Sequence, residues 1–268
     1  MIEKMKTAFL GSGFIAGAMI SGLTESGTIS GDQIMVVNPG NPVTAGAISE
    51  KYGAVLGEPE DLRDADLVVF CVKPQNFTEA MEQYGRYFDD RKLYVSVMAG
   101  ITTATLEKEI PGARVVRAMP NLGLSVGKSA TGFALGQFAT EEDGRLTEEL
   151  FGPMGLTEKV DESLISAVTA LSGSGPAYFY LLTEAMAEAA IRDGMDRDTA
   201  ERLARQTFFG SARLMEMNGN SASEMIDHVA SKGGTTEAGV KAMLEKGFKE
   251  SVEEGYLAAR RRSDALGK

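Results

Sequence analysis

The chain has 268 residues, and 43% of them are hydrophobic, which is enough for one large domain or two modest ones. Its formal net charge of -11 at pH 7 argues against a nucleic-acid partner, because phosphate binding needs clustered Lys and Arg. With a single cysteine and a single histidine, the sequence excludes an internal disulfide, a cysteine cluster and a multi-histidine metal site, so we expect no bound metal.

Neither of these two residues is expected to be catalytic. Cys71 follows the apolar residues 67–70 and is predicted to be a buried thiol in a strand, while His228 is expected to be a structural or surface group on a helix. No apolar run reaches the ~18 residues that a membrane helix needs, and no signal peptide precedes the first predicted strand. We therefore expect a cytoplasmic protein without a membrane partner.

A strand, a glycine turn and a helix follow one another between residues 5 and 23. Within them, Gly11, Gly13 and Ala16 form a G-x-G-x-x-A pattern. Gly11 permits the tight turn, Gly13 lets a pyrophosphate approach the backbone, and Ala16 lets helix and strand pack closely. The alternative is a glycine turn without a ligand. Because both flanks are present, the pattern favours dinucleotide binding at the start of the helix.

Strands and helices alternate up to residue 160. After the first strand, apolar runs at residues 34–37, 54–56, 67–72, 93–97 and 114–119 predict further strands. This alternation is typical of an α/β fold with a doubly wound, mostly parallel Rossmann sheet, which binds ligands outside the carboxyl ends of its strands. Besides the glycine turn, the loops at residues 73–76, 98–100 and 120–123 lie at such ends.

The second half, residues 161–268, is predicted to be all helical. A break is expected at residues 172–176, with Pro176 in the first turn of the next helix. Asp196 is expected to be the N-cap of a long helix, and Ser221 with Glu224 matches a capping box. These helices are rich in Ala, Leu and Met, which suggests a surface buried against a second copy of the chain. We therefore expect a homodimer formed through this domain.

The loop at residues 231–236 has the strongest chemical character in the helical half. Gly233 and Gly234 allow unusual backbone angles, and Thr235 or Thr236 is expected to cap the next helix. Such a loop offers N–H groups and hydroxyls to a small carboxylate. An ordinary capped loop between helices explains the pattern equally well.

Three polar residues at the predicted strand ends are candidates for ligand contacts. Asn38 stands where NAD enzymes usually carry an acid, which removes a repulsion and favours NADP(H), although no arginine is near to hold the 2′-phosphate. Lys73 is either a phosphate or ribose contact or a solvated charge. Asn121 either orients a substrate or braces its turn.

The residues also restrict the type of reaction. The sequence has no Tyr-x-x-x-Lys pair, and His228 is poorly placed as the base of a hydroxyacid dehydrogenase. Reduction of a C=N bond fits better, because the substrate nitrogen is already protonated or takes a proton from a hydroxyl or water.

At this point the sequence resembles the pyrroline-5-carboxylate reductase family over nearly its full length. The most specific match is TALSGSGPAY at residues 169–178. The other matching motifs are the early glycine pattern, Ala65-Asp66, VKPQ at residues 72–75, RAMPN at residues 117–121, Gln206-Thr207 with Gly210, and GGTT at residues 233–236.

The resemblance implies a Rossmann domain, an interlocking helical dimerisation domain and, often, assembly of dimers into larger rings. It implies hydride transfer from NADPH, or less often NADH, to the C=N carbon of 1-pyrroline-5-carboxylate, giving L-proline. It assigns Thr236 as the proton donor or relay. The cofactor contacts that it implies are Gly11, Ser12, Gly13, Phe14, Ile15, Asn38, Val72, Lys73, Pro74, Ala99 and Gly100. The substrate contacts, beside the candidate Asn121, are Ser231, Gly233, Gly234, Thr235 and Thr236.

The sequence departs from the family pattern at four places. Residues 122–124 read Leu-Gly-Leu instead of Thr-Pro-Ala, residues 127–129 read Gly-Lys-Ser instead of Gly-x-Gly, Lys232 replaces a proline, and Glu58 replaces an asparagine. These departures leave two alternatives: a reductase of a different cyclic imine, or a non-catalytic NADP(H)-binding regulator.

Overall fold

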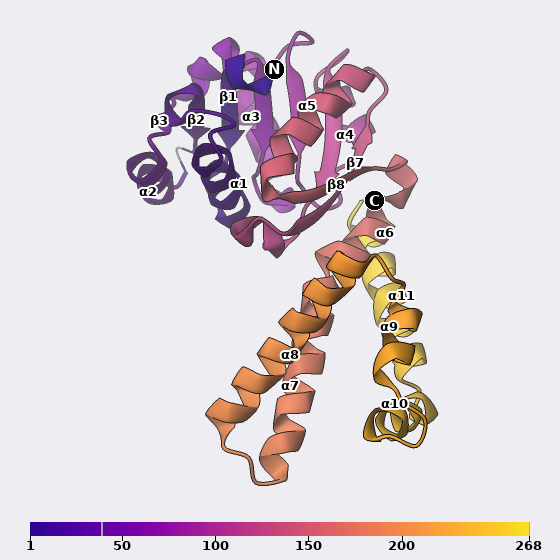
Figure 1. Ribbon diagram of the computed structural model, residues 1–268. Helices are drawn as coiled ribbons and strands as arrows, with labels where there is room; N and C mark the ends of the chain where they lie inside the picture. The colour runs from indigo at the N-terminus through magenta and orange to yellow at the C-terminus, as the bar shows by residue number, and fades with distance from the viewer. Residues whose placement is uncertain (39, 268) are drawn as a thin grey trace. The chain divides into compact units, whose positions relative to one another are not determined.

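A computed structural model describes residues 1–38 and 40–267 of the chain (Figure 1). It divides into two compact units, one formed by residues 1–174 together with the chain from Ala259 on, and one by residues 175–258. The boundary that we predict after residue 160 stays a prediction. By their contacts, residues 161–174 and the end of the last helix belong to the first unit.

The first unit is built on a sheet in the order β3-β2-β1-β4-β5-β6-β7-β8. Strands β1 to β6 are parallel, β7 runs antiparallel to β6, and β8 is parallel to β7. The strands are β1 (Thr7–Leu10), β2 (Ile34–Val37), β3 (Val55–Leu56), β4 (Leu67–Phe70), β5 (Leu93–Ser96), β6 (Arg114–Met119), β7 (Ser129–Leu135) and β8 (Gly155–Lys159). The predicted doubly wound, mostly parallel sheet is confirmed. Strands β7 and β8 were not predicted.

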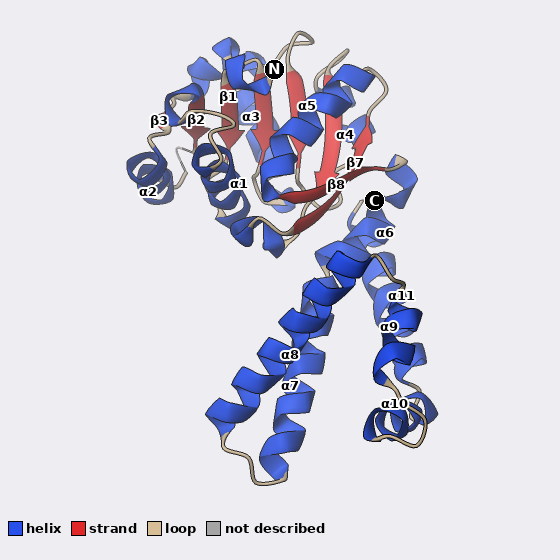
Figure 2. Ribbon diagram, viewed as in Figure 1, coloured by secondary structure: helices blue, strands red, loops and turns tan. Residues whose placement is uncertain are grey.

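Helices cover both faces of the sheet (Figure 2). Alternate strand residues face opposite sides, so that Val69 and Val95 pack under α1 (Phe14–Glu25), α2 (Pro42–Tyr52) and α5 (Glu141–Phe151). Val68 and Tyr94 pack under α3 (Phe77–Tyr84) and α4 (Thr103–Glu109). Short 3₁₀ helices lie at Ile2–Lys4, Gly31–Gln33, Pro59–Asp64, Pro74–Asn76, Gly85–Tyr87, Leu122–Val126, Gly152–Met154 and Glu162–Leu164.

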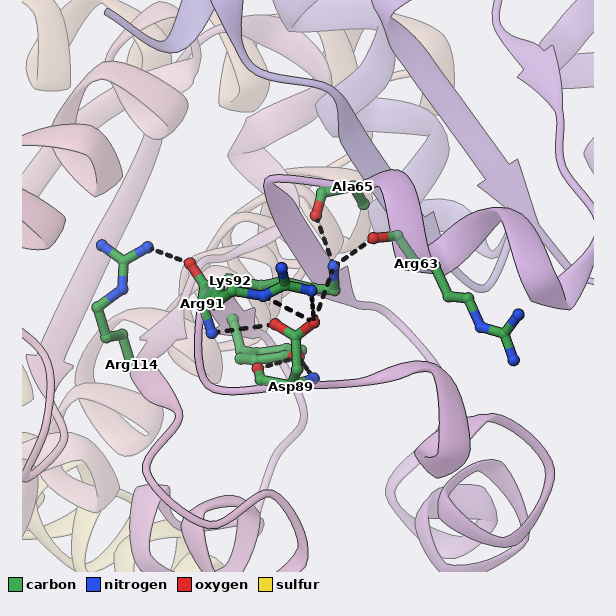
Figure 3. A network of polar contacts seen from close by, with 7 residues as sticks. Arg63, Ala65, Asp89, Arg91, Lys92 and Arg114 are labelled. Carbon is green, nitrogen blue, oxygen red and sulfur yellow. Dashed lines mark hydrogen bonds and ion pairs between the residues drawn. The ribbon is translucent and has the colours of Figure 1, made fainter.

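A network of hydrogen bonds and ion pairs lies at the amino end of β5 (Figure 3). Lys92 is only 4% exposed, and its ammonium donates to the carbonyls of Arg63 at 2.6 Å and Ala65 at 3.1 Å. It also forms an ion pair of 3.8 Å with Asp89. The Tyr94 hydroxyl donates to the Asp89 carbonyl at 2.8 Å. These bonds satisfy a buried charge at the edge opposite the carboxyl ends of the strands.

The chain enters the second unit through α6 (Ile165–Val168) and a π-helical turn (Thr169–Gly173). The expected break at residues 172–176 is confirmed only at Ser174, a bend between the π-helical turn and α7, because residues 172–173 continue the helix as a wider turn and α7 begins at Gly175. The helices that follow are α7 (Gly175–Arg192), α8 (Arg197–Asn218), α9 (Ala222–Val229), α10 (Thr235–Glu245) and α11 (Phe248–Leu266). Pro176 lies in the first turn of α7, as predicted.

The predicted caps of α8 and α9 are confirmed. The Asp196 carboxylate accepts from the Thr199 N–H at 2.9 Å, and Ser221 and Glu224 form the capping box. The α7 and α8 helices pack as a pair, with the rings of Phe179 and Phe208 5.2 Å apart. Among the described residues no helix is long and apolar enough to cross a membrane.

Candidate active site

The glycine turn after β1 has the geometry that a dinucleotide requires. Gly11 has φ 109°, and a Cβ there would lie 2.9 Å from the Cys71 carbonyl oxygen, so no other residue fits. A Cβ at Gly13 would meet nothing within 4 Å, so this side of the turn is open. Gly13 is the N-cap of α1, and no side chain caps the helix. The first N–H groups of α1 are therefore not satisfied by a side-chain cap at Gly13.

The loop after β2 is tied to the glycine turn by neutral polar groups. The Asn38 amide donates to the Ser12 hydroxyl at 2.7 Å, and that hydroxyl is also hydrogen-bonded to Thr44. The Asn41 side chain accepts from the Thr44 N–H at the start of α2. The structure thus brings Asn38 and Ser12 together, as a shared cofactor role requires. Thr44 was missed, although its place three residues after the cap Asn41 was a usable signal.

The loop after β4 carries Val72, Lys73 and Pro74. Lys73 is exposed, and it forms no ion pair with any residue in the described ranges 1–38 and 40–267. The prediction of a buried strand thiol is wrong for Cys71, which lies one residue past the end of β4 and is only partly buried. Burial still raises the pKa of its thiol, which agrees with the expected inert role.

The end of α11, near the C-terminus of the chain, packs against the loop after β5. Gly100 has φ 81°, and a Cβ there would lie 2.6 Å from the carbonyl oxygen of Leu266, at the end of α11. The glycine at this position is thus required by the fold itself. Ala99 is half-buried beside it.

Asn121 uses both ends of its amide within the protein. Its Oδ1 accepts from the Gly123 N–H at 2.9 Å, and its Nδ2 donates to the Ser172 carbonyl in the π-helical turn at 3.0 Å. Of the two roles considered, these bonds support the bracing of a turn. Contact with a substrate stays a prediction.

The Ser231–Thr236 loop lies in the second unit and is described by itself. The N-cap of α10 is Gly234, so the prediction that a threonine caps this helix is wrong; Thr235 and Thr236 are its first two residues. The Gly233 N–H donates to the Glu237 carboxylate at 2.7 Å. Ser231 is exposed and Thr236 is half-buried. Glu237 was missed, although its position in the first turn of the helix was a usable signal.

Two further observations concern the single histidine and the possibility of a metal site. His228 is exposed on α9, as expected. No group of three or more His, Cys, Asp or Glu within the described ranges is arranged to hold a metal ion.

Comparison with known proteins decides the family. The family described as pyrroline-5-carboxylate reductase dimerisation matches residues 162–266, and the family described as NADP oxidoreductase, coenzyme F420-dependent, matches residues 6–100. A pyrroline-5-carboxylate reductase of Pisum sativum is 37% identical, over 96% of this chain and 94% of that protein. The chain belongs to the pyrroline-5-carboxylate reductase family.

Solved structures of pyrroline-5-carboxylate reductases have the same fold. That of Coxiella burnetii superposes with a TM-score of 0.92 at 32% identity, covering 98% of this chain and 99% of that one. That of Plasmodium falciparum, solved with NADP bound, has a TM-score of 0.86 at 25% identity and covers 99% of both chains. The resemblance of the sequence to this family is thereby confirmed.

Proposed function

We propose that this chain reduces 1-pyrroline-5-carboxylate to L-proline with NADPH as the preferred hydride donor and NADH as the alternative. The observation that carries this proposal is the full-length similarity to pyrroline-5-carboxylate reductases. The reaction class agrees with a site that lacks a strong base but has hydroxyls and backbone N–H groups.

The residues of the first unit fit a dinucleotide. The open face of Gly13 and the uncapped N-terminus of α1 suit a pyrophosphate, because N–H groups and the helix dipole attract anions. In this proposal Gly11 to Ile15, Asn38, residues 72–74 and Ala99 with Gly100 hold the cofactor. When bound, the cofactor supplies the hydride that adds to the C=N carbon.

The residues of the second unit suit the substrate. In this proposal the carboxylate of the imine is bound by the Ser231 hydroxyl and by Gly233, Gly234 and Thr235, of which Gly234 already donates its N–H to the Ser231 carbonyl at 2.9 Å. Asn121, a residue of the first unit, is a further candidate contact. Thr236 donates or relays the proton to the ring nitrogen. Lys232 is exposed within this loop, and its positive charge favours an anionic substrate.

We also propose that the chain works in the cytoplasm as a homodimer, which assembles further into rings, without a nucleic-acid or membrane partner. Large apolar side chains are exposed on α7 and α8, among them Leu181 at 65% and Phe209 at 63%. Exposed apolar faces of this kind are typical of surfaces that are buried on association.

The proposal is tested by following NADPH oxidation with 1-pyrroline-5-carboxylate and with other cyclic imines, and by identifying the product. Turnover that is fastest with 1-pyrroline-5-carboxylate and yields L-proline supports it. Faster turnover of another imine favours the altered-substrate alternative. Binding of NADPH without oxidation under any of these imines favours the regulator.

A further inference from the structure

The loop between β5 and α4, residues 97–102, is held in its middle and at its far end by parts of the chain that are distant in sequence. At its far end, the Glu162 carboxylate accepts hydrogen bonds from the Thr103 N–H at 2.8 Å and from the Thr103 hydroxyl. Thr103 is 3% exposed and is the first residue of α4. In its middle, the Leu266 carbonyl lies against Gly100.

These two contacts come from the two connections between the compact units. Glu162 lies on the segment that leads into the helical unit, and Leu266 lies on the part of α11 that belongs to the sheet unit. The two connections also touch each other, because the Ser263 hydroxyl donates to the Ser166 hydroxyl at 3.2 Å and Ser263 is 5% exposed. The loop is therefore fixed by both connections at once.

Glu162 makes the stronger of these two contacts. Besides its two bonds to Thr103, it forms an ion pair of 3.5 Å with Arg117 on β6, whose side chain is 8% exposed. Burial lowers the pKa of the Arg117 guanidinium, and the nearby Glu162 charge partly opposes this shift. A carboxylate with one buried cation and two donors is held firmly, because hydrogen bonds to a charged group are stronger than neutral ones.

We propose that Glu162 is a positioning residue, which acts through Thr103 to hold the loop with Ala99 and Gly100 in the geometry that binds the dinucleotide. This inference rests on the proposed function, which places these two residues at the cofactor. Two residues separate Gly100 from Thr103, so a displacement of Thr103 moves the loop. Binding sites tolerate displacements of only a fraction of an ångström.

The test uses Glu162→Gln, Thr103→Val and the double variant, with Glu158→Gln on the exposed face of β8 as the matched control. The dissociation constant of NADPH is measured by fluorescence titration, together with the thermal midpoint of unfolding. We expect Glu162→Gln to weaken NADPH binding about five- to tenfold, as the loss of a charge-assisted hydrogen bond predicts. We expect Thr103→Val to weaken NADPH binding less. The loss of binding free energy in the double variant should be smaller than the sum of the two single losses.

Kinetics separate a positioning role from a merely structural one. We expect Glu162→Gln to raise the KM for NADPH by the same factor, with little change in the KM for the imine or in kcat at saturating NADPH. A lower thermal midpoint with unchanged NADPH affinity, or additive effects in the double variant, would overturn the inference alone. Wild-type protein that binds no NADPH would overturn the proposed function and the inference with it.

Discussion

The backbone N–H of Gly233 donates a hydrogen bond of 2.7 Å to the carboxylate of Glu237. Glu237 is the third residue of α10, so its side chain reaches back over the start of its own helix. Gly233 is one of the residues that we propose to bind the substrate carboxylate. The chain thus holds one of its own carboxylates on a donor that we propose for the substrate.

We therefore expect Glu237→Gln to lower the KM for 1-pyrroline-5-carboxylate about two- to fivefold, because a like charge is removed from the anion site. Steady-state kinetics at saturating NADPH measure this. Glu245→Gln at the other end of α10 is the control, and 1-pyrroline, which lacks the carboxylate, should show no effect. A rise in the KM would mean that Glu237 instead organises the loop for the substrate.

Thr236 is the proposed proton donor, and two substitutions separate its hydroxyl from its size. We expect Thr236→Ala to lower kcat about a hundredfold, since positioned proton transfer typically contributes at least that much. Thr236→Ser keeps the hydroxyl and should retain most of the rate. Thr78→Ala, at an exposed position on α3, is the control. Equal rates in wild type and Thr236→Ala would assign the proton to water.

The choice of cofactor is expected to depend on Asn38. Asn38→Asp places a negative charge where the 2′-phosphate of NADPH is expected, and this charge repels the phosphate. In related folds an acid at this place accepts hydrogen bonds from the ribose hydroxyls of NADH. The KM for NADPH should rise about tenfold, and that for NADH should fall or stay constant. The ratio of kcat/KM for the two cofactors measures the change. An unchanged ratio would place the 2′-phosphate elsewhere.

Association is expected to depend on the apolar faces of α7 and α8. We expect Leu181→Glu combined with Phe209→Glu to shift the protein towards the monomer, because charged side chains are costly to bury. Sedimentation velocity measures this, with Glu188→Gln on α7 as the control and circular dichroism as the check on folding. A dimer of unchanged stability would place the interface on other helix faces.

Asp89 gives a prediction on pH. The side chain of Arg91, which donates at 2.6 Å, holds the pKa of the Asp89 carboxyl below its ordinary value. A carboxyl with a lower pKa in the folded state stabilises the fold above its unfolded pKa, and this contribution is lost as the pH falls through the folded pKa. Asp89→Asn should therefore lower the free energy of unfolding at pH 7. The difference should begin to shrink below about pH 5 and vanish only when the pH lies below the folded pKa, which is itself lower than the ordinary value of about 4.

Chemical denaturation at several pH values measures this difference, with Asp90→Asn at the exposed neighbouring position as the control. A difference that persists at the lowest pH would show that Asp89 stabilises the fold by something other than its charge.

The parallel part of the fold was predictable because its signals are local. Runs such as residues 67–70 are apolar throughout, as strands buried on both faces must be. Strand β8 (Gly155–Lys159) gave no such signal, because it lies at the end of the sheet and its one large apolar residue, Leu156, is exposed. Strand β7 contains Gly132, whose position close to Val168 is a tertiary contact that no local pattern reveals.

The candidate site was predictable where a motif has its own backbone geometry. Position 11 requires a glycine because the Cys71 backbone approaches it closely. The strand-turn-helix pattern already implies such a tight turn. The contacts of Glu162 with Thr103 and of Leu266 with Gly100 join residues that are far apart in sequence, so sequence patterns cannot show them. The N-cap role of Gly234 was not predicted, because serine and threonine are usually preferred to glycine at the N-cap of a helix.

The most direct test of the central claim is the rate of NADPH oxidation by purified protein with 1-pyrroline-5-carboxylate, with L-proline quantified as the product. The account predicts rapid oxidation with one L-proline formed for each NADPH consumed. Protein that binds NADPH yet forms no L-proline from 1-pyrroline-5-carboxylate would contradict it.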